Sequence, residues 1–468
     1  MRYFHAKTFF FCFFLLCLSK LAVHGQSSGG VQNTSSKNSE TLRLSLEQAT
    51  NYALTHNYSV INARLEVEIA KKKILETTTI GLPQVNGEIN FQNMLNIPTQ
   101  VLPAKAFNPM AEYGELVAVQ FGTNYTAAVG LTATQLIFDG AYIVGLQASK
   151  TYGKLSKNQL GKTQNDLKAN VAQAYYSALV AKENIRILGQ SIENSKKLLS
   201  ETNEVYKSGF IEENDVDQLN LLVQNLQNSL KRSERQADLA LQLLKFQIGL
   251  DIDNQIELTE NLDEILLSLN IENLYNTDFQ SSKHIDYQLM LNQQNLMQLN
   301  LKKEKYAYLP SIGAFLSHQE NALRNEFTFF ENGPWYPTTV WGVSIKVPIF
   351  DSGMKYAKIK QAKMEYEKTI ISTTQVEQSL KLQAQTSKAD LISSYERLLT
   401  EKQNLLLAEK IQNKTLIKYQ EGLASSLDLN QVQNQLLSTQ GNYINTVFDL
   451  LNAKSRFDKA MNFNQSTN

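Results

Sequence analysis

The side chains that most often carry out catalysis or bind metal ions are few and scattered in this chain. Beyond the first 25 residues, histidine occurs only at His56, His284 and His318, without the spacing of metal ligands. Gly161-Lys162-Thr163 matches the end of a phosphate-binding loop, but Ser156 stands where its first glycine is required and no strand pattern precedes it. The sequence therefore predicts a protein that is not an enzyme, with no catalytic residues, no metal and no cofactor.

The charge balance of the chain excludes another class of function. Lysine and arginine number 45, as do aspartate and glutamate, so the formal net charge is zero. A protein that binds nucleic acid through its phosphates normally carries an excess of positive charge. We therefore expect no nucleic-acid partner.

The first 25 residues have the pattern of a signal peptide. Two basic residues precede an apolar run from Phe9 to Leu18, and a small residue, Gly25, follows. An uncleaved anchor helix is the alternative, but it would need about 20 apolar residues. Both cysteines, Cys12 and Cys17, lie in this segment, so the mature chain would contain none. Residues 26–40 are predicted to be a flexible N-terminal segment.

The elements that follow can be inferred from the prolines. All eight lie within 83–109 and 310–348, so 110–309 and 349–468 can form long helices. A helix over 141–206 would extend about 100 Å. Apolar and small residues recur there every three or four positions, which is typical of supercoiled helices. These seams are Val171, Ala174, Ala178, Ala181, Ile185, Leu188 and Ile192, and Leu219, Leu222, Leu226 and Leu230.

The two proline-containing windows alternate between apolar and polar residues. The alternation runs over Val85–Gln92, Tyr125–Thr134 and Trp341–Ile349, and more weakly over Ile312–Ser317. It predicts four strands with one apolar face, one pair within 84–139 and the other within 311–350. A soluble sandwich is the alternative, but the signal peptide and the flanking aromatic residues favour membrane strands. The candidate aromatic residues for the membrane interface are Phe121, Tyr125, Trp335, Tyr336 and Trp341.

Two short motifs occur twice, which indicates an internal duplication. Phe138-Asp139-Gly140 recurs as Phe350-Asp351-Ser352, and Tyr206-x-x-Gly209 recurs as Tyr419-x-x-Gly422. Each half would hold a helix, a strand pair and two long helices joined at a glycine turn. The predicted division is a first repeat at 41–247 with its tip near 209, an equatorial linker at 248–280, a second repeat at 281–460 with its tip near 422, and a tail at 461–468.

Four strands cannot close a barrel by themselves. Unpaired strand edges are not tolerated in hydrocarbon, and the smallest spanning barrels use about eight strands. The chain is therefore predicted to form oligomers. A dimer would supply eight strands and a trimer twelve, and both remain open at this point.

Taken together in order, the motifs resemble those of the TolC-like outer-membrane efflux proteins. The matching segments are Leu44–Ala49, Leu82–Val85, the two Phe-Asp-Gly/Ser corners and the two Tyr-x-x-Gly tips. The resemblance implies a mainly α fold with a transmembrane β-barrel. The expected protein is a homotrimer, with a 12-stranded barrel in the cell outer membrane and a long α-helical coiled-coil tunnel in the periplasm.

The resemblance also implies a function and partners. The expected function is a passive conduit of a tripartite efflux or type I secretion system. It would contact outer-membrane lipid and dock onto an inner-membrane pump of the RND, ABC or MFS type through a periplasmic adaptor protein. The alternative is a periplasmic coiled-coil spacer or adaptor that does not span a membrane. The transported substrate is not specified by the sequence.

The resemblance assigns roles to residues near the two tips. Asp428 would belong to a ring of carboxylates at the channel aperture, although it could also simply favour the helix dipole. Gln431 occupies a second ring position without a charge. The family pattern has an arginine where this chain has Ala424, so the salt bridge to Asp215 on the other tip is missing.

The glycine turns themselves are the implied adaptor-docking tips. Their residues are Gly209 with Phe210, and Gly422 with Leu423. A glycine permits a left-handed turn and close approach of another backbone. The alternative is that these glycines only end their helices.

Overall fold

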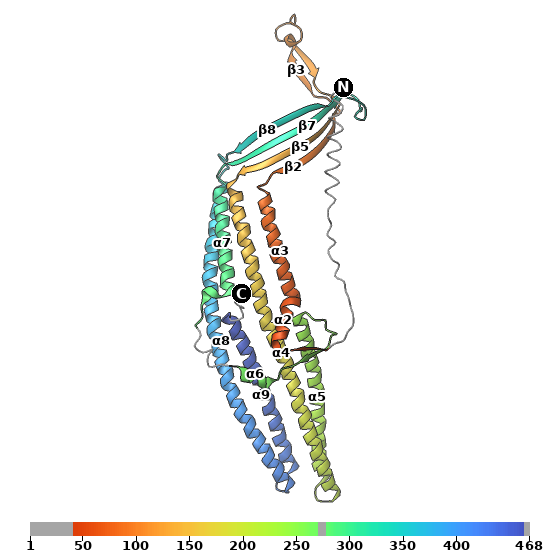
Figure 1. Ribbon diagram of the computed structural model, residues 1–468, viewed down its shortest axis with the longest axis vertical. Helices are drawn as coiled ribbons and strands as arrows, with labels where there is room; N and C mark the ends of the chain where they lie inside the picture. The colour runs from red at the N-terminus through yellow and green to blue at the C-terminus, as the bar shows by residue number, and fades with distance from the viewer. Residues whose placement is uncertain (1–40, 270–277, 463–468) are drawn as a thin grey trace. The chain divides into compact units, whose positions relative to one another are not determined.

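The computed structural model describes residues 41–269 and 278–462 (Figure 1). The chain divides into Met1–Leu42 and a large compact unit, Arg43–Asn468. The sheet, the long helices and the sites that they carry all belong to the larger unit.

Several predictions from the sequence lie outside the described residues. They are the signal peptide at 1–25, the flexible segment at 26–40, residues 270–277 of the linker and residues 463–468 of the tail.

One end of the larger unit is a four-stranded antiparallel sheet, in agreement with the predicted number of membrane strands. The strand order is β2-β5-β7-β8, so β2 and β8 each have one unpaired edge within this sheet. Every residue of β2 and nearly every residue of β8 is exposed. The strands are β2 (Gln84–Asn93), β5 (Tyr125–Phe138), β7 (Ser311–Arg324) and β8 (Tyr336–Lys346).

Two strands in the second half differ from their predicted bounds. The alternation was expected to continue to Ile349, but β8 ends at Lys346. Pro348 has no N–H to donate to a strand ladder, which accounts for the early end. β7 continues well beyond Ser317 because its polar residues pair with β8, as His318 does opposite Thr339. Because this part of β7 has polar residues on both faces, it lacks the alternation from which the strand was predicted.

Two long helices extend from the sheet, and each is followed by a shorter antiparallel helix that returns from its far end (Figure 1). With 68 residues, α4 confirms the predicted single helix and extends about 100 Å. The Asp139 carboxylate begins it by accepting a hydrogen bond of 2.7 Å from the Tyr142 N–H. No helix in the described part of the chain is both long and apolar enough to cross a membrane. The helices are α4 (Gly140–Lys207), α5 (Glu213–Ile248), α8 (Met354–Gln420) and α9 (Ser426–Ala460).

The two halves of the chain contain matching elements in the same order. α3 (Tyr58–Thr79) precedes the first strand pair and α7 (Ile285–Tyr306) precedes the second, and each has 22 residues. The long helices that follow have 68 and 67 residues, and the helices that return from the tips have 36 and 35.

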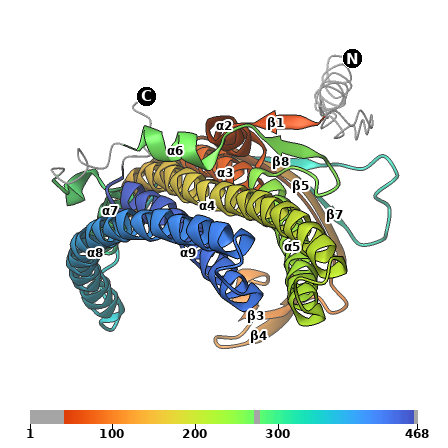
Figure 2. The same ribbon diagram turned by 90° about the horizontal axis from the view of Figure 1, so that it is seen from below.

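The helices pack side by side into a curved layer. α4 pairs with α5 and α8 pairs with α9, while α4 also contacts α3, α7 and α9. Seen from below, α8, α9, α4 and α5 follow the curve of this layer (Figure 2). The predicted seam is buried within the layer, and its most buried members are Val171, Ala174, Ala178, Leu188 and Ile192.

Shorter elements surround the middle of the long helices. Arg43 and Leu44 of β1 (Leu42–Leu44) lie beside β6 (Ile256–Leu258), where the Thr259 N–H donates to the Leu44 carbonyl at 3.2 Å. The buried Tyr175 hydroxyl of α4 donates to the same carbonyl at 3.1 Å, and burial raises the pKa of Tyr175. This girdle also contains α2 (Leu46–His56), α6 (Leu262–Ser268) and a 3-10 turn, η3 (Ser281–Lys283).

Candidate functional site

The first long-helix pair ends in a glycine turn at the end of the helices farthest from the sheet (Figure 1). Gly209 has φ of +79°, and its N–H donates to the Tyr206 carbonyl at 2.8 Å. The Phe210 N–H donates back to the Val205 carbonyl at 3.3 Å. These two bonds form the Schellman motif, which requires a left-handed residue where glycine is favoured.

The second pair ends in the same motif. Gly422 has φ of +74°, and its N–H donates to the Tyr419 carbonyl at 3.0 Å. The Leu423 N–H donates to the Lys418 carbonyl at 2.7 Å. A Cβ at either Gly209 or Gly422 would meet no atom within 4 Å. Both turns therefore leave open space in which another backbone could approach.

Apolar side chains project from both turns. Phe210 is 82% exposed and Leu423 is 77% exposed. Leu427, in the first turn of α9, is also exposed. Phe210 and Leu423 are the side chains expected to contact an adaptor, and their exposure leaves them available for a partner.

The structure places Asp428 at the start of α9 in a capping box. The Ser425 hydroxyl accepts a hydrogen bond of 3.1 Å from the Asp428 N–H, and the Asp428 carboxylate accepts one of 3.0 Å from the Ser425 N–H. Hydrogen bonds from the Ser425 backbone and side chain lower the pKa of the Asp428 carboxyl. Asp428 therefore caps its helix, as one of the two interpretations from the sequence expects, and its side chain is exposed. Its place in a ring of carboxylates stays a prediction.

The two tips are joined by hydrogen bonds, and no ion pair joins them within the described ranges. The buried Ser426 hydroxyl of α9 donates to the Asp215 carboxylate of α5 and lies 3.4 Å from Oε1 of Gln218. Nearby, the Thr202 hydroxyl of α4 lies 3.1 Å from the Tyr419 hydroxyl of α8. Asp215 thus has a partner in spite of the missing arginine at position 424.

Amide side chains line the exposed face of α9 above the tip. A shallow hollow of about 520 Å³ is bordered by Leu427 and by Asn430, Gln431, Asn434 and Gln435. Gln431, the uncharged second ring position, lies in this hollow, whereas Asp428 does not border it. The face of α9 that carries the predicted aperture residues is therefore mainly neutral and polar.

The predicted membrane-interface aromatics do not all lie at one level of the sheet. Tyr125 begins β5 and Tyr336 begins β8, both at the end of the sheet away from the helices. Trp341 lies opposite Leu316 near the middle of β8 and is 78% exposed. Phe121 and Trp335 lie just outside the strands. A cluster of stacked and edge-to-face rings joins Tyr125 to Phe91, Phe327 and Phe329.

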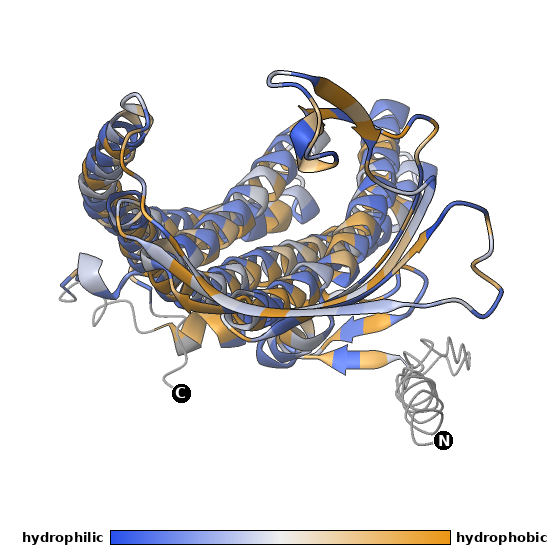
Figure 3. Cartoon of the chain, turned by 90° about the horizontal axis from the view of Figure 1, so that it is seen from above, coloured by the Kyte–Doolittle hydropathy of each residue, from blue (hydrophilic) through white to orange (hydrophobic). Residues whose placement is uncertain are grey.

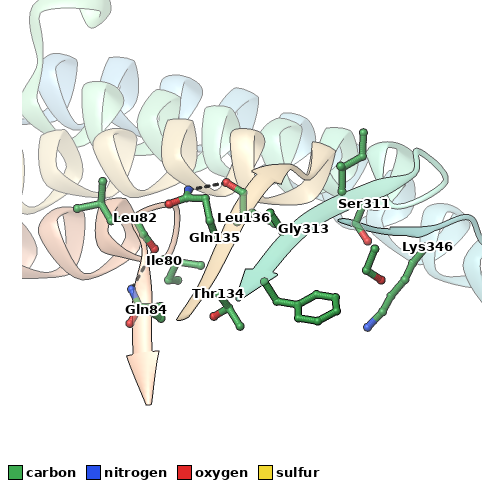
Figure 4. Close-up of a pocket in the computed structure, with 13 residues that line it drawn as sticks. Ile80, Leu82, Gln84, Thr134, Gln135, Leu136, Ser311, Gly313 and Lys346 are labelled. Atoms are coloured by element: carbon green, nitrogen blue, oxygen red, sulfur yellow. Dashed lines mark hydrogen bonds between the residues drawn. The ribbon is translucent and has the colours of Figure 1, made fainter. Parts of the chain in front are cut away.

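A hollow of about 350 Å³ marks the corner where the sheet passes into the helices (Figure 4). The Gln135 amide donates to the Gly81 and Leu136 carbonyls at 2.7 and 2.8 Å. The Tyr142 hydroxyl ties the same corner to the end of α3 by donating to the Thr78 carbonyl at 3.1 Å. These bonds fix the angle between sheet and helices, and the hollow lies between those elements.

The residues that fasten the tips could not have been found from the sequence. Ser426 lies one position after the serine that caps α9, and nothing in its neighbours distinguishes it from other serines. Thr202 continues a helical seam. Tyr419 belongs to the repeated Tyr-x-x-Gly motif and Asp215 to the family pattern, but neither signal indicated a partner on the other helix pair.

Part of the chain matches a known protein family. Residues 292–462 match the sequence pattern of the outer membrane efflux protein family. A comparison with curated protein sequences finds no match. The resemblance inferred from the motifs is thus confirmed by sequence in the second half of the chain.

Solved structures extend the similarity to most of the chain. CmeC, the outer membrane channel of Campylobacter jejuni, has a TM-score of 0.67 and 18% identity over 89% of this chain and 85% of its own. The MtrE outer membrane channel of Neisseria gonorrhoeae has a TM-score of 0.69 and 17% identity over 89% and 88%. The outer membrane protein VceC of Vibrio cholerae has a TM-score of 0.67 and 14% identity over 89% and 95%. The chain therefore has the fold of these outer-membrane proteins.

Proposed function

We propose that this chain is the outer-membrane channel of a tripartite efflux or type I secretion system. Three copies would form a passive conduit from the periplasm to the exterior. The observation that carries the proposal is the four-stranded sheet with two unpaired edges, continued by helices about 100 Å long. The match to the outer membrane efflux protein family and the fold shared with CmeC and MtrE support it.

The strand directions suit closure with neighbouring copies. Adjacent strands of the sheet are antiparallel throughout, so β2 and β8 run in opposite directions. β8 of one copy can therefore continue the antiparallel ladder with β2 of the next. Three copies would supply twelve strands and remove every exposed edge, as a spanning sheet requires. The matching element lengths in the two halves support the internal duplication on which this architecture rests.

The tips would be the attachment point for a periplasmic adaptor. Phe210 and Leu423 offer apolar contacts beside glycines with open space around them. An adaptor held there would link the conduit to an inner-membrane pump, which supplies the energy for transport. The pump would also set the substrate.

The same region would restrict the aperture. The Ser426–Asp215 hydrogen bond holds the start of α9 against α5, in place of the missing salt bridge. Three copies of α9 would bring the amide-lined face and the Asp428 carboxylates around one axis. Such a ring favours cations over anions.

Fractionation and channel recording test the proposal. The full chain with its own signal peptide is expected in the outer-membrane fraction, as a trimer that dissociates when heated in detergent. The purified trimer is expected to form conducting channels in planar lipid bilayers. A monomer released with the soluble periplasmic fraction would contradict the proposal and support a coiled-coil spacer instead.

A cysteine scan across the sheet edges tests the closure itself. Single cysteines in β2 and β8 of the same chain are expected to form disulfides between copies at matched depths. Cysteine pairs placed both in β2 serve as the control, because two β2 strands would not meet in the ring. Cross-linking of the control pairs alone would contradict the proposed order of strands.

A further inference from the structure

A second, smaller hairpin projects from the loop between β2 and β5. It consists of β3 (Thr99–Pro103) and β4 (Leu116–Gln120), connected through the 3-10 turn η1 (Ala104–Ala106). At its base the Met94 N–H donates to the Asn124 carbonyl at 2.7 Å. β3 and β4 pack against each other and closely against no other described helix or strand.

Both faces of this hairpin are apolar. On one face Val101 pairs with Ala118, and Leu116 lies beside them, with Val101 and Leu116 both exposed. On the other face Leu102 pairs with Val117. An isolated two-stranded hairpin is only marginally stable in water, and an apolar surface of this kind marks a site of interaction.

The tip of the hairpin is ordered and also strongly apolar. The Met110 N–H donates to the Asn108 side chain at 3.0 Å, and Lys105 lies over the Tyr113 ring at 5.3 Å. Nevertheless Met110 is 94% exposed and Tyr113 is 95% exposed, and Phe107 is also exposed. The chain thus holds three large apolar side chains outward in a defined turn.

The hairpin lies on the concave side of the curved layer. Figures 2 and 3 view the larger unit from opposite ends, and both place β3 and β4 within the curve rather than outside it. In a closed ring of copies this side faces the channel axis. The hairpins of neighbouring copies would then point toward one another across the outer mouth.

We propose that the three β3–β4 hairpins of a trimer meet through Phe107, Met110 and Tyr113 and form an apolar lid over the external opening of the channel. This inference rests on the proposed function, because it needs the ring of copies. Each apolar tip would contact the same tip of the neighbouring copies. Charged side chains are few on this surface, only Lys105, Glu112 and Glu115 in the hairpin and its turn, so the three tips can approach without strong repulsion.

Shortening the tip tests the lid while leaving the sheet intact. The Ala104 N–H donates to the Glu115 carbonyl at 2.8 Å, so these two residues already face each other. Replacing residues 105–114 with Asn-Gly would close β3 and β4 with a two-residue turn. The variant is expected to form the same heat-sensitive trimer and to show a rise in conductance of at least about twofold, because an apolar constriction limits conduction.

Disulfide trapping tests the contact between tips independently. Both natural cysteines lie in the predicted signal peptide, so a Met110→Cys variant would carry one cysteine per mature copy. Oxidation is expected to give covalent dimers and to lower the conductance, with recovery after reduction. Phe330→Cys is the matched control, because Phe330 is 93% exposed in the β7–β8 connection, and little cross-linking is expected there.

The results of these experiments distinguish a failure of the lid proposal from a failure of the proposed channel function. A conducting trimer whose conductance is unchanged by the shorter tip, and whose Met110→Cys variant forms no dimers, would overturn the lid and leave the proposed function in place. The same would follow if Phe330→Cys cross-linked as well as Met110→Cys. Absence of trimers from the unmodified chain would instead overturn the proposed function.

Discussion

At the scale of single residues, a hydrogen bond joins the two tips where the family resemblance led us to expect a salt bridge. Ala424 removes the arginine of the family pattern, and the Ser426 hydroxyl binds the Asp215 carboxylate instead. A hydrogen bond to a charged group contributes about 1.5–3 kcal/mol, comparable to a partly buried ion pair. A neutral donor has no charge of its own to be screened, so the link should depend less on salt than a surface ion pair does.

Breaking the link between the tips should loosen the periplasmic aperture. In Ser426→Ala the Asp215 carboxylate loses its donor, and we expect a larger mean conductance in planar bilayers. Ser438→Ala is the control, since Ser438 lies on the exposed face of the same helix and makes no contact with α5 that the structure records. Equal conductance in the two variants would show that the hydrogen bond does not restrain the aperture.

Asp428 should give the aperture a preference for cations. Hydrogen bonds from Ser425 lower the pKa of the Asp428 carboxyl in each copy, so the side chain is charged at neutral pH. We expect the reversal potential in a salt gradient to indicate cation preference at neutral pH. Asp428→Asn should abolish the preference. A preference unchanged in this variant would remove Asp428 from the aperture.

At the scale of elements, the chain uses the same turn twice to place two surfaces side by side. Both long-helix pairs end in a Schellman motif with a left-handed glycine, and both present an apolar residue directly after it. The helices above them have nearly equal lengths, so the two turns lie at similar distances from the sheet. Equal helix lengths would therefore let one partner contact both turns, as the proposed docking requires.

A bulky residue at Gly422 should interfere with docking more than with folding. Gly422→Leu would force a side chain into the left-handed region at a cost of about 1–2 kcal/mol, which is small for a trimer with long helices. We expect export to be lost while heat-sensitive trimers still form. Gly441→Ala is the control, because a Cβ there meets no atom within 4 Å and Gly441 lies within α9. Normal export by Gly422→Leu would show that Gly422 serves only to end α8.

The junction between α7 and its neighbours should be sensitive to acid through His284. The buried His284 ring accepts a hydrogen bond of 3.2 Å from the Asp286 N–H and so caps α7. Burial lowers the pKa of His284, and the charge of Lys162 adds to the lowering. The Asp286 carboxylate opposes it, while Lys459 raises the pKa through its backbone hydrogen bond and lowers it through its charge. The unfolded chain then binds more protons than the folded chain between the folded pKa and about 6.5.

This difference in proton binding fixes the sign of the pH dependence of folding stability. The contribution of His284 to stability is complete above about pH 6.5 and is lost as the pH falls toward the lower folded pKa. We expect the unfolding midpoint to decrease over this window. His284→Asn keeps a capping side chain but cannot titrate, so its midpoint should change less over the same window. Parallel pH profiles for the two proteins would contradict the assignment.

At the scale of the whole molecule, the apolar surface left exposed on the helices indicates where copies would meet. Leu239, Leu243 and Phe246 form an exposed stripe on α5, and Leu382 and Leu406 are exposed on α8. α5 and α8 lie at opposite ends of the curved layer (Figure 2). A ring built from identical copies brings two different surfaces of each copy together, so these two edges would face each other.

A charge in the stripe on α5 should weaken assembly without changing the fold of the helices. Leu239 is 63% exposed in the single chain, and in Leu239→Glu the carboxylate would be buried between copies. We expect the trimer to dissociate at a lower temperature in detergent, with an unchanged circular dichroism spectrum. Asn220→Glu introduces the same group at an exposed position on another face of α5, away from this stripe. A similar loss in both variants would point to charge alone rather than to burial at an interface.

The sequence by itself determined the features that depend on neighbouring residues. Proline is excluded from helix interiors, so its confinement to two windows indicated where α4 and α8 could extend. The period-two pattern located a pair of strands before each of these helices. Glycine is the residue that a left-handed turn favours, so Gly209 and Gly422 marked the tips. These signals are local because they arise from backbone geometry.

Only the tertiary structure brought together residues that are far apart in the chain. Ser426 meets Asp215, and Tyr419 meets Thr202, only because two helix pairs of matching length fold side by side. The full extent of β7 was not predicted, because the polar residues in its second half do not alternate with apolar ones. The β3–β4 hairpin was not predicted either, because its segment has the composition of a loop. The position of that hairpin inside the curve follows from the curvature of the sheet, which no single stretch of sequence encodes.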